Sequence, residues 1–143
     1  MQGRTDLIPL TALQPIKGWE EYFQHGEGYL KTARGAHQKA VPSFTPEILY
    51  NLIAMAIEKF VMAALMRHGA LPYNHTMGDL VEAMENTFPG RMGEIGEGLL
   101  ALDKYQEICD LDAFNIRPPT QEEIPAMLKL AGRLRDLVVN ELL

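Results

Sequence analysis

Apolar positions along the chain recur mainly at spacings of three and four, and the longest apolar run lies within residues 45–69. Thr45 is a good N-terminal cap, because its hydroxyl can accept a hydrogen bond from a free amide of the first turn. Pro46 suits the first helical position, and Gly69 suits the left-handed conformation that ends a helix. Between these residues most sides are apolar, which predicts a central helix that is buried on most sides.

The same spacing predicts four further helices. In chain order the predicted helices span residues 17–40, 45–69, 76–88, 92–109 and 120–142. Thr76 and Thr120 are each followed three residues later by an acidic residue, a pattern typical of a capping box. Because no stretch alternates with a period of two, we predict an all-α fold: an up-and-down bundle of four to five helices over residues 17–143. Residues 1–16 form an N-terminal arm with two prolines and no sustained period.

Glycines interrupt two of these helices. Gly26, Gly28 and Gly35 each weaken the first helix by about 1 kcal/mol relative to alanine, which predicts close packing of that helix against the central one. Residues 90–98, GRMGEIGEG, match neither a P-loop nor a dinucleotide-binding fingerprint. We interpret them as a flexible, tightly packed helix start.

Length and charge limit the function. The chain has 143 residues, which is one ordinary domain, and a net charge of −6. Residues 1–70 carry +1 and residues 71–143 carry −7. An acidic chain does not bind nucleic acid by bulk charge, because phosphate binding needs a cationic surface. A local basic patch would have to come from the first half or from the C-terminal arginines.

The apolar central helix also bears on assembly and location. This helix is apolar on most sides, and the other helices have apolar faces too. Together they present more apolar surface than one small bundle needs to bury, which predicts a homodimer. Glu58 and Lys59 lie near the middle of the central helix, so we predict that it does not span a membrane. The single cysteine, Cys109, allows no intrachain disulfide and falls on an apolar face, where packing is its usual role. With no apolar signal core at the N-terminus, this predicts a cytoplasmic protein.

Few residues have an obvious chemical role. No histidine has an acidic residue three positions before it, as a di-metal carboxylate site requires, so we predict neither a metal nor a cofactor. Glu58 and Lys59 either pair at a helix edge, with the Lys59 amine reaching water, or line a pocket or dimer cleft. Arg117, in a proline-containing loop before the last helix, can bind phosphate or carboxylate bidentately, although a loop arginine is also ordinary. We predict that it contributes more to anion binding than any other arginine.

The order of elements resembles the HEPN domain (higher eukaryotes and prokaryotes nucleotide-binding) over residues 17–143. The motifs are a helix with an early Trp (WEEYFQHGEGYLKTAR), the helix AMAIEKFVMAALMRHGALP, the element NHTMGDLVEAM and the loop IRPPT. They correspond to the family's A-x-E-K helix, its His-Asp-Leu element and its Arg-Tyr-Pro loop. Here His75 and Asp79 are spaced three residues further apart, and Pro118 replaces the tyrosine.

The resemblance implies a bundle that commonly dimerises and associates with nucleotide or RNA. Many family members are toxins, antitoxins or accessory domains beside minimal nucleotidyltransferases. The residues that correspond to family positions are Glu58, Lys59, His75 and Arg117. On this interpretation Arg117 and Lys59 face phosphate, and His75 orders its loop by hydrogen bonding.

Ribonuclease members of the family carry an arginine followed, after four to six residues, by a histidine. No histidine follows Arg117 in this chain, so the sequence predicts a non-catalytic domain that binds a nucleotide or a partner nucleotidyltransferase. Two alternatives stay open. One is a protein–protein interaction module without a small ligand. The other is a degenerate ribonuclease that uses His68 or His75 as acid or base, with Arg67 beside the phosphate.

Overall fold

The computed structural model describes residues 14–105 and 117–143. In those residues it has five α-helices and no strand. The helices are α2 (Trp19–Gln38), α3 (Pro46–Arg67), α4 (Met77–Thr87), α5 (Gly93–Ala101) and α6 (Ile124–Leu137). The shorter turns are two 3₁₀ turns, η1 (Leu102–Tyr105) and η3 (Gln121–Glu123), and a π-helical turn, η4 (Val138–Leu142). The prediction of an all-α bundle of four to five helices is confirmed.

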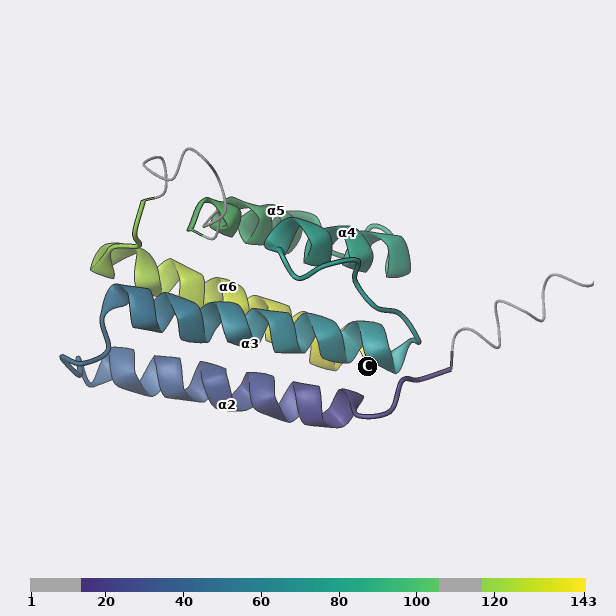
Figure 1. Ribbon diagram of the computed structural model, residues 1–143, viewed down its shortest axis with the longest axis horizontal. Coiled ribbons are helices and arrows are strands. Elements are labelled where there is room, and N and C mark those ends of the chain that lie inside the picture. The colour runs from purple at the N-terminus through teal and green to yellow at the C-terminus, as the bar shows by residue number, and fades with distance from the viewer. Residues whose placement is uncertain (1–13, 106–116) are drawn as a thin grey trace, which may run out of the picture.

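Helix α3 is the centre of the bundle, as predicted. Figure 1 shows the long helices α2, α3 and α6 side by side, with the shorter pair α4 and α5 along one side of them. The Thr45 hydroxyl accepts from the Ile48 amide at 3.3 Å, and Gly69 has a φ of 77°. The predicted start and end of the central helix are therefore both confirmed.

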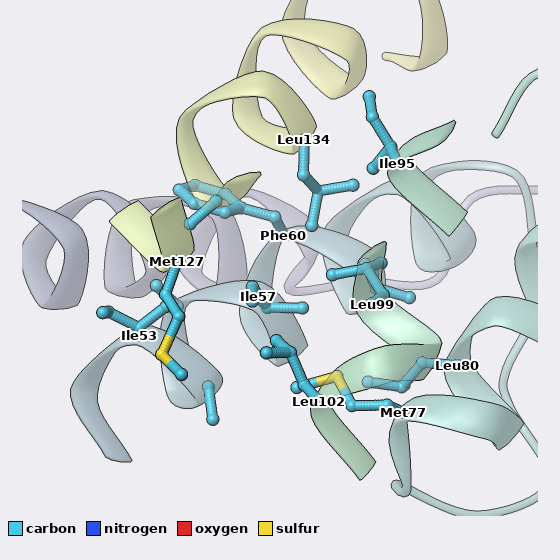
Figure 2. Close-up of a cluster of buried hydrophobic side chains, with 14 of the residues drawn as sticks. Ile53, Ile57, Phe60, Met77, Leu80, Ile95, Leu99, Leu102, Met127 and Leu134 are labelled. Atoms are coloured by element: carbon cyan, nitrogen blue, oxygen red, sulfur yellow. The ribbon is translucent and has the colours of Figure 1, made fainter. Parts of the chain in front are cut away.

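The core forms where α3 meets the other helices. Figure 2 shows Ile53, Ile57 and Phe60 of α3 among side chains of α4, α5 and α6. Phe60 is fully buried, and its ring lies 5.5 Å from that of Phe23 on α2. The chain's own helices thus cover most of the apolar surface of α3. Covering that surface does not require a second subunit, and the homodimer stays a prediction.

Helix α3 is, in the described part of the chain, the one helix long and apolar enough to cross a membrane. Within the bundle, 67% of its most apolar window is buried. The core helix of a water-soluble bundle meets the same criteria of length and composition, so this resemblance to a membrane span is weak. The cytoplasmic location and the absence of a membrane association stay predictions.

The three glycines of α2 have different surroundings. A Cβ atom on Gly26 would lie 2.8 Å from the ring of Phe60, so the predicted close packing against α3 is confirmed there. Gly28 and Gly35 have no neighbouring atom within 4 Å of such a Cβ, and for them the prediction was wrong. These two glycines lie on a side of α2 that α3 does not cover.

The glycine-rich residues 90–98, which include the start of α5, agree with the interpretation from the sequence. Gly90 and Gly93 have positive φ values of 77° and 50°, so they turn the chain between α4 and α5. A Cβ on Gly98 would lie 2.8 Å from the Leu130 side chain of α6. The stretch therefore supplies both backbone freedom and a close helix contact.

The fourth helix is shorter than predicted. Helix α5 ends at Ala101 and continues only as the 3₁₀ turn η1, whereas the sequence predicted a helix as far as Cys109, which lies outside the described residues. The side chain of Asp103 accepts hydrogen bonds at 3.1 Å from the amides of Met77 and Gly78, at the start of α4. This contact caps α4 from a distant part of the chain, and the turn at η1 places Asp103 where it can do so.

The last helix begins later than a cap at Thr120 alone would imply, and Pro125 explains why: in a helix that started directly after Thr120, this proline would lie too deep. The Thr120–Glu123 capping box is present, as predicted, but it caps the 3₁₀ turn η3. Helix α6 then begins at Ile124, which places Pro125 in its first turn, where proline is tolerated.

At the other end of the chain, the Ile16 amide donates to the Met66 carbonyl at 2.7 Å. That contact ties the end of the predicted arm to α3, while residues 1–13 lie outside the described part.

Candidate functional site

Glu58 and His75 are two predicted site residues that the fold brings together. The segment after α3 brings His75 back to the middle of that helix, and His75 Nδ1 lies 2.6 Å from Glu58 Oε2. The pair lines a hollow of about 340 Å³ beside Asn51 and Met55. The predicted role of His75, ordering its loop by hydrogen bonding, agrees with this geometry.

Lys59 lies next to Glu58 but faces helix α2. Its Nζ is 3.9 Å from Glu58 Oε1 and 4.8 Å from the ring centroid of Tyr22. A lysine above an aromatic face is held by a cation–π attraction and keeps its amine near water. Of the two readings offered by the sequence, the geometry fits the pair at a helix edge for Lys59 and the pocket lining for Glu58.

Arg117 is held by residues on both sides of it in the sequence. Its guanidinium donates to both oxygens of Glu123, at 3.0 and 2.7 Å, and to the Tyr105 hydroxyl at 3.3 Å. The Tyr105 hydroxyl in turn donates to Glu123 at 2.8 Å. These three side chains, which we call the Arg117 cluster, connect the two chain positions that flank residues 106–116. An anion at Arg117 would have to compete with Glu123.

The Arg117 cluster also shifts the pKa values of its members. The hydrogen bond from Arg117 holds the pKa of the Glu123 carboxyl well below its ordinary value of 4.5. The reciprocal hydrogen bond raises the pKa of Arg117. Burial, and then the bond to Glu123, raises the pKa of the Tyr105 phenol above 10.0. The cluster is therefore a stable ion pair over the whole neutral range.

The four predicted residues do not form one site in the described structure. No contact joins Arg117 to Glu58, Lys59 or His75 in the described residues, and the hollow at Glu58 shares no lining residue with the cleft beside Tyr105 and Glu123. A single phosphate facing both Arg117 and Lys59 has no support in this geometry.

His68 and Arg67, the residues of the alternative ribonuclease hypothesis, contact different parts of the fold. His68 Nε2 is 2.7 Å from the Leu142 carbonyl, and the ring meets Phe88 edge-on at 5.0 Å. Arg67 lies 5.7 Å from the ring centroid of Trp19. His68 thus links the end of α3 to the C-terminal turn, and Arg67 packs against the start of α2.

A groove whose lining holds more cations than carboxylates was not predicted as a site. It lies between α2 and α6 and has a volume of about 810 Å³. Its charged lining residues are Glu27, Lys31, Arg34, Arg135 and Asp136. We call this hollow the α2/α6 groove.

The three cations of the α2/α6 groove differ in their partners within the described part of the chain. Arg135 is occupied, because it donates to Glu27 at 2.7 and 3.1 Å and to Asp136 at 3.2 Å. Lys31 and Arg34, in contrast, have no ion-pair partner among the described residues. They lie three positions apart on α2 and therefore on one face.

A sequence signal for this groove existed in the glycine pattern. Gly28 and Gly35 are seven residues apart, so they share a helix face with Lys31 and leave the backbone of α2 uncovered there. On α6, a Cβ at Gly132 would lie 2.5 Å from the Arg34 guanidinium, so Gly132 makes room for that side chain. Glycines beside cations were therefore a signal for an uncovered face of α2, although the sequence predicted that Gly28 and Gly35 pack against α3.

No group of three or more His, Cys, Asp or Glu side chains in the described parts of the chain is placed to hold a metal ion. Comparisons with models of known protein families, with curated proteins and with solved structures gave no match. The resemblance to the HEPN domain therefore stays a prediction from the sequence motifs.

The Arg117 cluster gives a pH-dependent prediction. Because the pKa of Glu123 is lower in the folded chain than in the unfolded chain, its ion pair stabilises the fold fully above about pH 4.5. That stabilisation is lost as the pH falls through the folded-state pKa. We expect the free energy of unfolding, measured with urea between neutral and acid pH, to fall less steeply for Glu123→Gln than for wild type. Glu122→Gln is the matched control and should follow wild type; identical profiles for Glu123→Gln and wild type would contradict the prediction.

Proposed function

We propose that this chain is a HEPN-like, non-catalytic helical domain that binds a nucleotide through its phosphates in the α2/α6 groove. The observation that carries the proposal is the pair of exposed cations, Lys31 and Arg34, which share one face of α2 and lack ion-pair partners in the described structure. A positively charged side chain without a partner can hydrogen-bond a phosphate without first losing another contact.

The charge distribution supports this location. The chain is acidic overall, so a phosphate requires a local exception, expected from the first half or the C-terminal arginines. The α2/α6 groove combines both sources, since Lys31 and Arg34 come from the first half and Arg135 from the last helix. Its two acidic residues, Glu27 and Asp136, are both paired with Arg135. The remaining charge of the groove is therefore positive.

The size and lining of the groove also suit a nucleotide. Its volume of about 810 Å³ lies within the ~300–1,000 Å³ that is usual for small-molecule sites. The amide side chains of Gln24 and Gln38 line it as well, and each can donate and accept hydrogen bonds from a base or a sugar. The groove thus offers cations for phosphate and neutral polar groups for the rest of the ligand.

A non-catalytic role agrees with the contacts of the candidate acid–base residues, because each of them is bound to a different part of the fold. His68 contacts the Leu142 carbonyl and His75 contacts Glu58, while Arg67 packs on Trp19. Arg117 stays a candidate anion ligand, but its pairing with Glu123 ranks it behind the groove.

The test is a calorimetric titration of ATP and GTP against wild type and the double variant Lys31→Gln/Arg34→Gln. Losing a charge-assisted hydrogen bond costs about 1.5–3 kcal/mol, so each substitution should weaken binding by roughly tenfold or more. The double variant Lys39→Gln/Arg133→Gln removes the same charge at exposed positions outside the groove and should bind like wild type.

Three results would count against the α2/α6 groove. The first is the absence of nucleotide binding to wild type, and the second is equal weakening in both double variants. The third is selective weakening by Arg117→Gln, which would return the site to the Arg117 loop.

One observation favours a second function, an interaction module that binds a protein. Leu71 and Tyr73 are 60% and 94% exposed, more than any other large hydrophobic side chain in the described residues, and they lie two positions apart. The partner nucleotidyltransferase that the resemblance implies belongs to this second candidate, whereas the homodimer stays a separate prediction.

A further inference from the structure

We infer that the segment from Leu71 to Tyr73 and the neighbouring face of α4 form a docking surface for a partner protein that presents an arginine or lysine beside apolar side chains. The inference deepens the second candidate function and does not depend on nucleotide binding in the α2/α6 groove. We call this region the Tyr73 surface.

The apolar part of the Tyr73 surface is held out from the bundle. Tyr73 is 94% exposed and Leu71 is 60% exposed, and Pro72 between them fixes one backbone angle. The segment is anchored on one side by Gly69, which closes α3, and on the other by the contact of His75 with Glu58. The two side chains are therefore presented from a short, fixed connection, which lowers the entropy cost of docking.

The charged side chains of the surface are all acidic. Residues 69–87 contain Asp79, Glu82 and Glu85 and no lysine or arginine. Among the described residues, Glu82 has no ion-pair or hydrogen-bond partner. Asp79 accepts from the Thr76 hydroxyl at 2.7 Å, which leaves its charge unneutralised. A surface of one sign attracts a partner of the opposite sign.

Both parts meet in one hollow. The hollow has a volume of about 290 Å³ and is lined by residues 71–73 and, on α4, by Asp79, Glu82 and Ala83 among others. This is smaller than most small-molecule sites, and it suits one inserted side chain. An arginine or lysine in the hollow would lie beside the carboxylate of Glu82 and the ring of Tyr73, which together attract a cation. Leu71 would contact the apolar neighbours of that cation.

The experiment uses the full chain and three labelled synthetic peptides, with binding followed by fluorescence anisotropy. The first peptide is an amphipathic sequence of leucine and arginine, the second replaces arginine by glutamate, and the third replaces leucine by serine. We expect the first to bind best, because it alone matches both the charge and the apolar anchors. Tyr73→Ser and Glu82→Gln should each weaken its binding by roughly three- to tenfold.

Matched variants distinguish specific binding at the Tyr73 surface from non-specific binding to any exposed apolar or acidic side chain. Leu100→Ser removes an apolar side chain that is 46% exposed on α5, and Glu94→Gln removes an exposed acidic one there; both should bind like wild type. Lys31→Gln/Arg34→Gln should also keep peptide binding, so that a failure of nucleotide binding is distinguishable from a failure here. Equal weakening by Leu100→Ser and Tyr73→Ser would overturn the inference, as would preference for the glutamate peptide. Self-association of wild type that Tyr73→Ser abolishes in sedimentation would assign the surface to a second copy and overturn it too.

Discussion

Replacing Phe60 by alanine should destabilise the chain by about 3–5 kcal/mol, the range found when a buried aromatic ring is truncated. Phe60 is fully buried, packs its ring 5.5 Å from that of Phe23 and also covers Gly26. Figure 2 shows Phe60 of α3 near Leu134 of α6, so the ring faces α6 as well as α2. Small domains are stable by only about 5–15 kcal/mol, so this loss removes a large share of the total. Urea unfolding followed by circular dichroism measures it.

A matched position on the same helix checks the reasoning about Phe60. Ile48 is 42% exposed near the start of α3, so Ile48→Ala should change the free energy of unfolding by less than about 1 kcal/mol. A similar loss in both variants would mean that burial within this bundle does not set the cost. A fully folded Phe60→Ala with wild-type stability would contradict the central position of α3.

The positions of the helices were predictable because their signals are local. Thr45, Pro46 and Gly69 mark the ends of α3 by capping and backbone preference, and each acts within a few residues of its own position. Thr76 caps α4 in the same way, accepting from the Asp79 amide at 3.0 Å. Where the physical cause lies within one turn of helix, the sequence pattern and the structure agree.

The errors arose where the cause lies in another element. Helix α5 ends two residues before Asp103, which caps α4 across 26 positions of the chain. The periodicity of α5 contains no information about that contact. Likewise, the sequence placed Gly26, Gly28 and Gly35 in one class, because helix propensity cannot say which neighbour each glycine faces.

The candidate site was predictable only in part, for the same reason. Glu58 was predicted as a site residue because it is a charge within an apolar helix, and His75 was predicted from the family motif. The structure shows that these two side chains are in contact. For Arg117 the sequence left open an anion ligand or an ordinary loop arginine, and the bidentate contact with Glu123 agrees with the ordinary role. The glycines beside Lys31 and Arg34 marked an uncovered face of α2, but only the packing of α6 beside α2 shows that these two cations line a groove.

The two proposed surfaces use different parts of the fold and can therefore act together. The α2/α6 groove uses cations of α2 and α6, whereas the Tyr73 surface uses the segment after α3 and the acidic face of α4. No residue lines both, so a bound nucleotide does not exclude a bound protein. A domain with a basic groove on one pair of helices and an acidic docking surface on another fits an accessory role beside a partner.

Placing leucine at Gly26 and at Gly28 should have opposite effects on stability. At Gly26 a Cβ atom alone would lie 2.8 Å from the Phe60 ring, so a whole leucine side chain must push α2 away from α3. Overpacking of this kind costs about 1–3 kcal/mol and sometimes more. At Gly28 nothing lies within 4 Å of the new Cβ, and leucine is a better helix former than glycine by up to about 1 kcal/mol.

Thermal and urea unfolding of the two single variants measures this difference directly, because the substitution is the same and the sites are two residues apart on one helix. We expect Gly26→Leu to unfold at a lower urea concentration than wild type, and Gly28→Leu at an equal or higher one. Combining Gly26→Leu with Phe60→Ala should restore part of the loss, since the removed ring occupies the space that the leucine needs. If the double variant is as unstable as the sum of its parts, or if both glycine sites respond alike, the close approach of α2 and α3 at Gly26 is wrong.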